Sequence, residues 1–232
     1  MENMLWIPSS TRGFADPEVY GELRFGTKEN AQKNFILNPG FEIGNSVDSL
    51  LGWEFTCFPK DSVALSSLKS SFNLVDDGKN KFIYVDFSKL KTKALKNKTS
   101  LCIQQQFSHE IVEKLKKTNV LLEADICCTC FCINEARPSI ALRCWNKSGK
   151  QLINGTDRLL VDNYTLNKCG YGNEETILGK WIQLSNSIFI PEETCSMDIL
   201  ISIPIPTENE IGTCISIDNL KLREVVDSKN NL

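Results

Sequence analysis

A succession of short strand-like runs constrains the fold of this chain most strongly. From residue 34 onward, runs rich in β-branched and aromatic residues alternate with turns of Gly, Pro, Asn and Asp. FNLVDD (72–77) and KFIYVDF (81–87), joined by Gly78-Lys79-Asn80, predict a hairpin. Further strands are expected at 100–107, 120–133, 139–146, 180–190, 197–205 and 213–225. Only HEIVEKLKK (109–117) has helical spacing, so the pattern predicts an all-β sandwich with one short helix.

Alternation within the strands indicates which side chains face the core. In SIALRCWN (139–146), Ile140 and Leu142 alternate with Arg143 and Trp145. Because successive side chains of a strand point to opposite faces, Arg143 and Trp145 are expected on the face away from the core. The longer run VLLEADICCTCFCI (120–133) places Glu123 and Asp125 opposite its apolar face in the same way.

The two ends of the chain lack this pattern. Residues 1–33 scatter aromatic residues among Pro, Gly, Ser and charged residues, which predicts an irregular N-terminal arm before a domain at 34–225. The aromatic side chains of such an arm either anchor it to another surface or pack back on its own domain. Residues 226–232 are expected to form a flexible tail, and the polar segment 155–179 a long surface excursion.

Charge and hydrophobicity limit the partners of the chain. A net charge of −3 argues against broad electrostatic binding of nucleic acid or an anionic membrane surface. No apolar run approaches the length of a bilayer span, so no membrane insertion is expected. The first residues lack a basic region followed by an apolar stretch, so we expect no secretory signal, and a location in a cytosol or on a virus particle or other extracellular particle.

Ten cysteines are many for a protein without a secretory signal. They show no pair of C-x2-C motifs, and the single histidine, His109, offers little for a zinc site. Buried, reduced thiols are the favoured interpretation, with disulfides or a metal site as the alternatives.

Three short motifs in fixed order carry a resemblance to a known family. NPGFEIG (38–44) is followed by Gly52-Trp53, SLCIQQQF lies at 100–107, and GKWIQLSNSIFIP (179–191) precedes CISIDNLKL (214–222). In this order they resemble the jelly-roll carbohydrate-binding modules attached to xylanases and cellulases, which are galactose-binding-like β-sandwiches. The resemblance implies a jelly roll in which the opening and closing motifs lie side by side.

The family commonly holds a structural calcium ion between its opening and closing strands. Glu42 and Asp218 match its carboxylate positions, and calcium prefers hard oxygen ligands of this kind. The metal-free alternative is hydrogen bonding of the two side chains to neighbouring backbone groups.

The resemblance also implies a glycan-binding face that combines aromatic rings with polar side chains. The alternation offers Gln104, Gln106, Arg143 and Trp145 on the face opposite the core. Three tyrosines are candidates to border this face, namely Tyr84, Tyr164 and Tyr171. Trp145 could instead pack against a loop, and Trp53 and Trp181 match packing positions of the family.

Three functions remain in competition at this point. The first is a non-catalytic glycan-binding module. The second is a structural or host-attachment protein of a virus particle, mounted on other subunits through residues 1–33, which is compatible with the first. The third is a glycoside hydrolase, which needs two carboxylates at a defined separation, and no spacing in the sequence singles out such a pair.

Overall fold

The computed structural model describes residues 33–46, 49–58, 68, 71–78, 80–87, 100–130, 137–153, 158–205 and 214–225. Ten strands lie in this part of the chain: β1 (Glu54–Phe58), β2 (Phe72–Asp76), β3 (Lys81–Asp86), β4 (Ser100–Gln106), β5 (Asn119–Cys130), β6 (Ser139–Trp145), β7 (Arg158–Leu160), β8 (Trp181–Phe189), β9 (Ser196–Pro204) and β10 (Cys214–Glu224). Three short helices accompany them: α3 (His109–Leu115), α4 (Asn163–Lys168) and α5 (Glu174–Ile177). The predicted arm (apart from Lys33) and the predicted tail lie outside the described residues.

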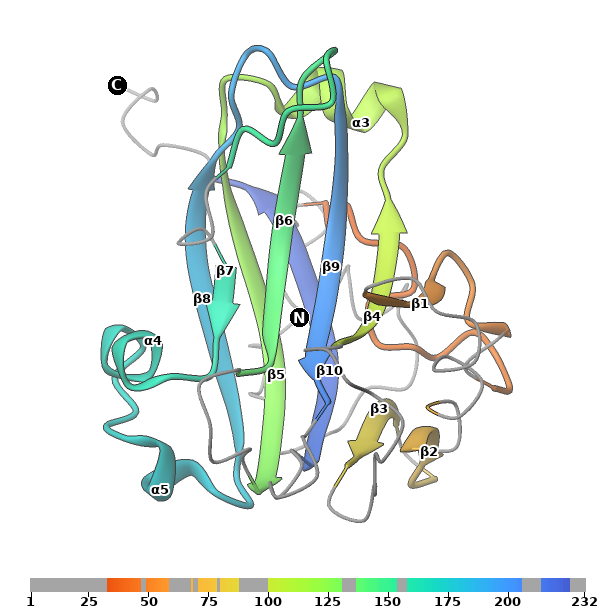
Figure 1. Cartoon of the computed structure of the whole chain (residues 1–232), viewed down its shortest axis with the longest axis vertical. Coiled ribbons are helices and arrows are strands. Elements are labelled where there is room, and N and C mark those ends of the chain that lie inside the picture. Colours follow the sequence, from red (N-terminus) through yellow and green to blue (C-terminus); the bar gives the residue numbers. More distant parts are fainter. Residues whose placement is uncertain are drawn as a thin grey trace, which may run out of the picture.

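The strands form two five-stranded antiparallel sheets that pack face to face, as Figure 1 shows. The first sheet has the order β1-β4-β9-β6-β7 and the second the order β2-β3-β10-β5-β8. In Figure 1, β6 and β9 of the first sheet lie in front of β5 and β10 of the second. The chain is therefore an all-β jelly-roll sandwich, as the strand pattern and the motifs predict, and β2 and β3 form the predicted hairpin.

The core lies between the sheets and is built from one side of each strand. On β6, Ile140, Leu142 and Cys144 are at most 4% exposed, while the residues between them are less buried or face outward. Strands with this period bury aliphatic side chains against the opposite sheet, which stabilises the fold by about 1.5–3 kcal/mol for each fully buried residue.

The opening and closing motifs lie side by side, as the resemblance implies. The amide of Phe35 donates to the carbonyl of Leu222, and the amide of Leu220 donates to the carbonyl of Pro39. The pairing of β10 with β5 shifts register between Asp218 and Lys221, and this irregularity frees the Leu220 amide for the opening segment. Trp53 is buried there as predicted.

The segment 155–179 differs from the predicted surface excursion. It contains β7, which adds a fifth strand beside β6, and the helices α4 and α5, so the prediction of one helix was incomplete. Side-chain caps explain both helices: Asp162 accepts a hydrogen bond from the Thr165 amide, and Asn173 accepts one from the Thr176 amide. None of the helices in the described part is long and apolar enough to cross a membrane.

Candidate functional site: a groove across the outer face of the first sheet

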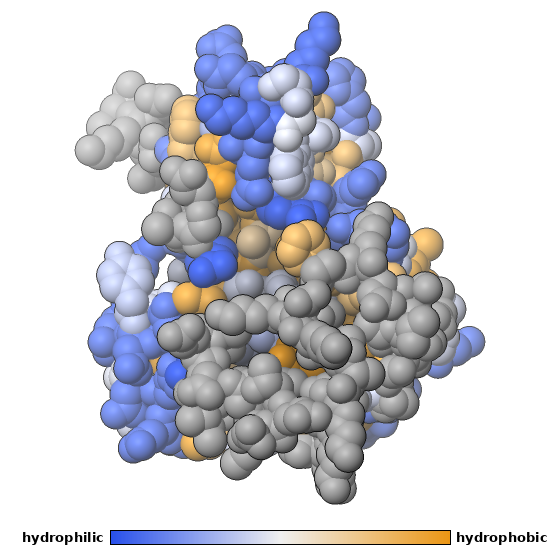
Figure 2. Space-filling view, in the orientation of Figure 1, coloured by the Kyte–Doolittle hydropathy of each residue, from blue (hydrophilic) through white to orange (hydrophobic). Residues whose placement is uncertain are grey.

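A groove of about 620 Å³ crosses the outer face of the first sheet. Its floor consists of small side chains on neighbouring strands, which pair in the cross-strand row Cys102, Ser202 and Ser139. The next row pairs Leu200 of β9 with Ala141 of β6. Small side chains in the middle of a sheet leave a hollow between the larger ones, so the sequence of the strands creates the groove directly. In Figure 2 the middle of this face carries apolar residues below a hydrophilic upper part.

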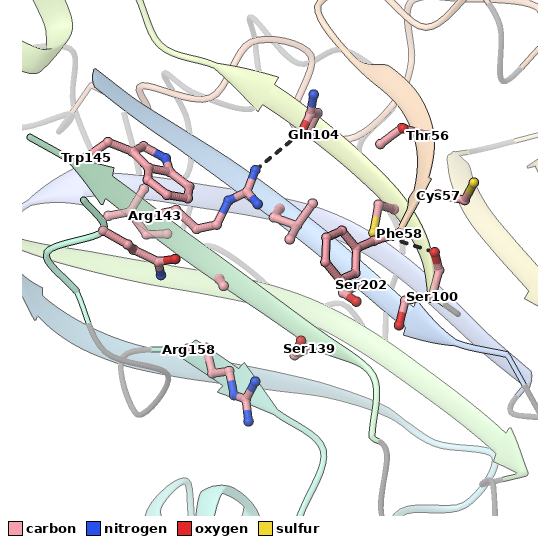
Figure 3. A pocket seen from close by; sticks show the side chains of 15 residues that line it. Thr56, Cys57, Phe58, Ser100, Gln104, Ser139, Arg143, Trp145, Arg158 and Ser202 are labelled. Atoms are coloured by element: carbon pink, nitrogen blue, oxygen red, sulfur yellow. Dashed lines mark hydrogen bonds between the residues drawn. The ribbon is translucent and has the colours of Figure 1, made fainter. Parts of the chain in front are cut away.

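Larger side chains border this floor. Trp145 and Arg143 rise from one end of β6, Phe58 ends β1 on the far side, and Arg158 lies on the edge strand β7 (Figure 3). Phe58 is 70% exposed, an unusual position for an aromatic ring. The groove therefore combines two aromatic rings with hydroxyl, amide and guanidinium groups, the combination that suits a sugar.

The aromatic end of the groove is held by an ion pair. The Arg143 guanidinium donates to both carboxylate oxygens of Asp198, over 2.6 and 2.9 Å, and to the side-chain oxygen of Gln104 over 3.3 Å. Its carbon Cζ lies 5.5 Å from the centroid of the Trp145 ring. Gln104 in turn donates to Glu54 on β1 over 2.8 Å. This network fixes the Trp145 end of the groove before any ligand arrives.

The groove also contains a thiol, that of Cys102. Burial raises the pKa of this thiol. The hydrogen bond with Ser202 and the charge of Arg143 lower the pKa, but by less than burial raises it. Cys102 therefore stays protonated at neutral pH and is a poor nucleophile.

The structure brings together four of the residues predicted to bind a ligand. Gln104, Arg143 and Trp145 line the groove, and Gln106 lines a neighbouring pocket of about 420 Å³ that shares Trp145. Because β9 lies between β4 and β6 and all three are in register, the alternation predicted from each strand adds up to one common face.

The three predicted tyrosines do not line the groove. Tyr84 lies on β3 of the second sheet, opposite Ser216 of β10. Tyr171 follows α4, and its hydroxyl accepts a hydrogen bond from the backbone amide of Gln183 on β8, also in the second sheet. Tyr164 is 77% exposed on α4. The expectation that they border the face of Gln104 is corrected, because it ignored which sheet each segment joins.

Phe58 and Arg158 are groove residues that the sequence analysis missed. The run EFTCF (54–58) alternates too briefly to stand out as a strand. Arg158 was hidden in the polar segment, although the apolar run Leu159–Val161 that follows it could have indicated a strand.

The predicted calcium ligands meet at the junction of the opening and closing segments. A Cβ atom added to Gly40 would lie 3.6 Å from an Asp218 carboxylate oxygen and 3.8 Å from a Glu42 carboxylate oxygen. The two carboxylates are therefore neighbours, as the resemblance implies.

The groups around these carboxylates do not fit a calcium ion. The Lys81 ammonium donates to the carbonyl oxygens of Glu42 and Gly44, each over 3.2 Å, and the Lys81 amide donates to the Glu42 side chain. Asp218 accepts hydrogen bonds from the Asn80 side chain and the Asn219 amide. A cation and several N–H donors already surround the oxygens that a metal would need, and the described residues contain no group of three or more His, Cys, Asp or Glu that could hold a metal. The residues present thus match the metal-free alternative.

Comparison with known proteins finds likeness only in structure. The sequence matches no protein-family model, and it matches no curated protein. Among solved structures it is similar to the enzymatically active domain of tailspike protein 4 of bacteriophage CBA120, with a TM-score of 0.47 and 9% identity over 83% of this chain. The chain spans 21% of that tailspike chain.

Carbohydrate-binding modules, the class that the motifs resemble, are also among these similar structures. The CBM22-1 xylan-binding domain of Xyn10C from Paenibacillus barcinonensis has a TM-score of 0.42 and 10% identity, over 85% of this chain and 97% of that one. The mannan-recognising module TmCBM27 has a TM-score of 0.36 and 9% identity, over 84% of this chain and 96% of that one. At this level of likeness they do not indicate what this chain binds.

Proposed function

We propose that the protein is a non-catalytic glycan-binding module whose binding site is the groove across the first sheet. The observation that carries this proposal is the arrangement of Trp145 and Phe58 at the two sides of a floor of small side chains. An aromatic ring offers its π face to the C–H groups of a sugar, and the serine hydroxyls and the side-chain amide of Gln104 suit the sugar hydroxyls.

The distribution of carboxylates supports a binding role over hydrolysis. None of the described residues that line the groove is Asp or Glu, whereas hydrolysis of a glycosidic bond ordinarily needs a pair of carboxylates at the site. Five carboxylates of the strand-forming runs lie elsewhere, in or beside strands of the second sheet: Asp76, Asp77, Asp86, Glu123 and Asp125.

Filling the groove tests the proposal. Ala141→Trp places a large ring on the floor and should abolish binding in a panel of soluble polysaccharides assayed by affinity electrophoresis. Ser187→Trp, on the exposed side of β8 in the second sheet, is the matched control and should bind as the unmodified protein does. A protein that binds no glycan in the panel, or an Ala141→Trp variant that binds undiminished, contradicts the proposal.

Removal of single rings gives a graded test. Trp145→Ala and Phe58→Ala should each weaken binding by about three- to tenfold, the effect expected for one lost ring contact. Phe189→Ala, which removes a ring that is 55% exposed on the second sheet, should leave binding unchanged.

Attachment to a larger assembly, such as a virus particle, is a further part of the proposal. The observation behind this part is the aromatic-bearing segment 1–33, nearly all of which lies outside the described residues. The native mass of the full chain and of a variant lacking residues 1–33 provides the test. A full chain that is monomeric, and a shortened chain that joins its assembly as well as the full chain, would both count against this part. In that case glycan binding by a free module remains.

A further inference from the structure

The charged residues in the described lining of the groove all have one sign. Its described lining contains two arginines, Arg143 and Arg158, and no Asp or Glu. The chain as a whole has the opposite balance, with 29 acidic against 26 basic residues. The described lining of the groove thus carries positive charge on a protein whose net charge is negative.

The two arginines differ in how they are paired. Arg143 is neutralised by its two hydrogen bonds to Asp198, so it contributes little net charge. Arg158 is exposed, and none of the described residues forms an ion pair or a hydrogen bond with its side chain. Among the described lining residues, Arg158 is therefore the cation that remains available to a ligand.

The position of Arg158 directs it to the same face as the groove floor. It pairs directly with Ala141, which pairs with Leu200, so the three side chains follow one cross-strand row. Ser139, one strand away, offers a hydroxyl beside it, and Figure 3 shows Arg158 on the Ser139 side of the groove, apart from Trp145. A guanidinium presents parallel N–H donors that match the two oxygens of a carboxylate.

From these observations, and resting on the glycan-binding function proposed above, we infer that the groove selects glycans that carry carboxylates. The carboxylate binds Arg158 at the edge strand β7, while neighbouring sugar rings contact Trp145 and Phe58. Such a carboxylate occurs in the uronic acid units of plant and bacterial polysaccharides and in the sialic acids that end animal glycans, and the binding assay separates these two sources.

The binding assay compares acidic glycans with neutral counterparts of the same backbone. Polygalacturonate is paired with its fully methyl-esterified form, glucuronoxylan with unsubstituted xylan, and sialyllactose with lactose. The acidic member of at least one pair should bind about tenfold more tightly than its neutral counterpart, as expected for one charge-assisted contact to a partly exposed arginine. This preference should shrink as salt is added, because the contact is solvent-exposed. Preference for a polymeric uronate or for sialyllactose identifies the source.

Two variants assign the preference to Arg158. Arg158→Gln should reduce affinity for the acidic glycan by about tenfold more than it reduces affinity for the neutral one. Lys180→Gln makes the same change in net charge at an exposed position before β8 and should affect neither. Equal binding of the acidic and neutral forms, or an equal loss in both variants, overturns the inference.

The floor-filling variant separates this inference from the proposed function. If only neutral glycans bind and Ala141→Trp abolishes their binding, the groove binds glycans but the inferred selectivity is wrong. If no glycan of either kind binds, the proposed function fails and the selectivity fails with it.

Discussion

Arg143 lies against Trp145, with its guanidinium carbon 5.5 Å from the centroid of the tryptophan ring. The same guanidinium donates two hydrogen bonds to Asp198, whose side chain is 11% exposed, and the arginine side chain is 23% exposed. The Trp145 ring thus lies against an ion pair that is largely shielded from water. This relationship links the stability of the sheet to the shape of the proposed binding site.

Arg143→Gln should therefore reduce both stability and binding. It leaves the Asp198 carboxylate without its two charged donors, which costs on the order of 1–3 kcal/mol, and it removes the support of the Trp145 ring. Urea denaturation measures the first effect and polysaccharide affinity the second. The double variant Arg143→Gln/Asp198→Asn should recover part of the lost stability, because no unpaired charge remains. A double variant that is as unstable as the sum of the single variants would show that the two residues do not interact.

The second prediction concerns the anchor of the opening segment. The buried side-chain amide of Gln105 donates to the carbonyl of Leu37 and accepts a hydrogen bond from the amide of the same residue, each over 2.8 Å. It imitates the backbone of a neighbouring strand. Gln105→Leu leaves both backbone groups of Leu37 without these partners and should lower the free energy of unfolding by about 1–3 kcal/mol.

Gln106→Leu serves as the control for this prediction. It makes the same substitution at the next position of β4, where the side chain is exposed, and should change the urea midpoint little. Equal midpoints for the two variants would mean that the Gln105 bridge does not stabilise the fold.

The sequence was sufficient to predict the sandwich and the Trp145 end of the groove. Strand alternation assigns a face to each side chain, so the sequence alone assigns Arg143 and Trp145 on one strand and Gln104 on another to the outer face. The order of strands in a sheet is not contained in that pattern. For this reason the correct members of the groove could be predicted, while Tyr84, on a strand of the other sheet, was wrongly added.

The missed residues show a second limit. Phe58 and Arg158 belong to the short edge strands β1 and β7, which gain their strand structure by pairing with a long neighbour. A strand of three residues has too few positions for alternation to be recognised. These edge strands border the groove on two sides. Alternation in the sequence therefore does not reveal the residues that they contribute to it.

The third prediction concerns Lys81, at the junction of the opening and closing segments. Its ammonium binds two carbonyl oxygens that are 37 and 39 residues away in the sequence, a relationship that no local motif contains. Because this cation already satisfies the oxygens, a chelator or added calcium should leave the melting temperature unchanged. Lys81→Met should lower the free energy of unfolding by about 1–2 kcal/mol, since two partly buried carbonyl groups lose a charged donor.

Two measurements control this third prediction. Lys150→Met changes an exposed lysine in the turn after β6 and should have little effect on thermal unfolding. A rise of several degrees in the melting temperature of the unmodified protein on addition of calcium would contradict the prediction and restore the metal site that the resemblance implies.

The last prediction is a pH dependence that arises at Glu42. Burial raises the pKa of its carboxyl to about 7. The hydrogen bond from the Lys81 amide and the charge of Lys81 lower this pKa, but their effect is smaller than that of burial. The ordinary pKa of this carboxyl, which applies in the unfolded chain, is 4.5, so between the two pKa values the folded state binds more protons than the unfolded state. This carboxyl therefore makes the protein less stable as the pH rises through that window, and the full penalty is present above the folded-state pKa.

Glu42→Gln removes this titration and keeps a side-chain oxygen that can accept the hydrogen bond from the Lys81 amide. The variant should gain stability relative to the unmodified protein at about pH 8 and gain none at about pH 4, with a difference on the order of 1 kcal/mol because solvent screens this half-buried carboxyl. Urea midpoints measured across that range give the comparison, with Glu193→Gln, an exposed position between β8 and β9, as the control. Parallel pH profiles for Glu42→Gln and the unmodified protein would place the Glu42 pKa in the folded state near its ordinary value. The charge of Lys81 would then offset the effect of burial on the pKa of Glu42.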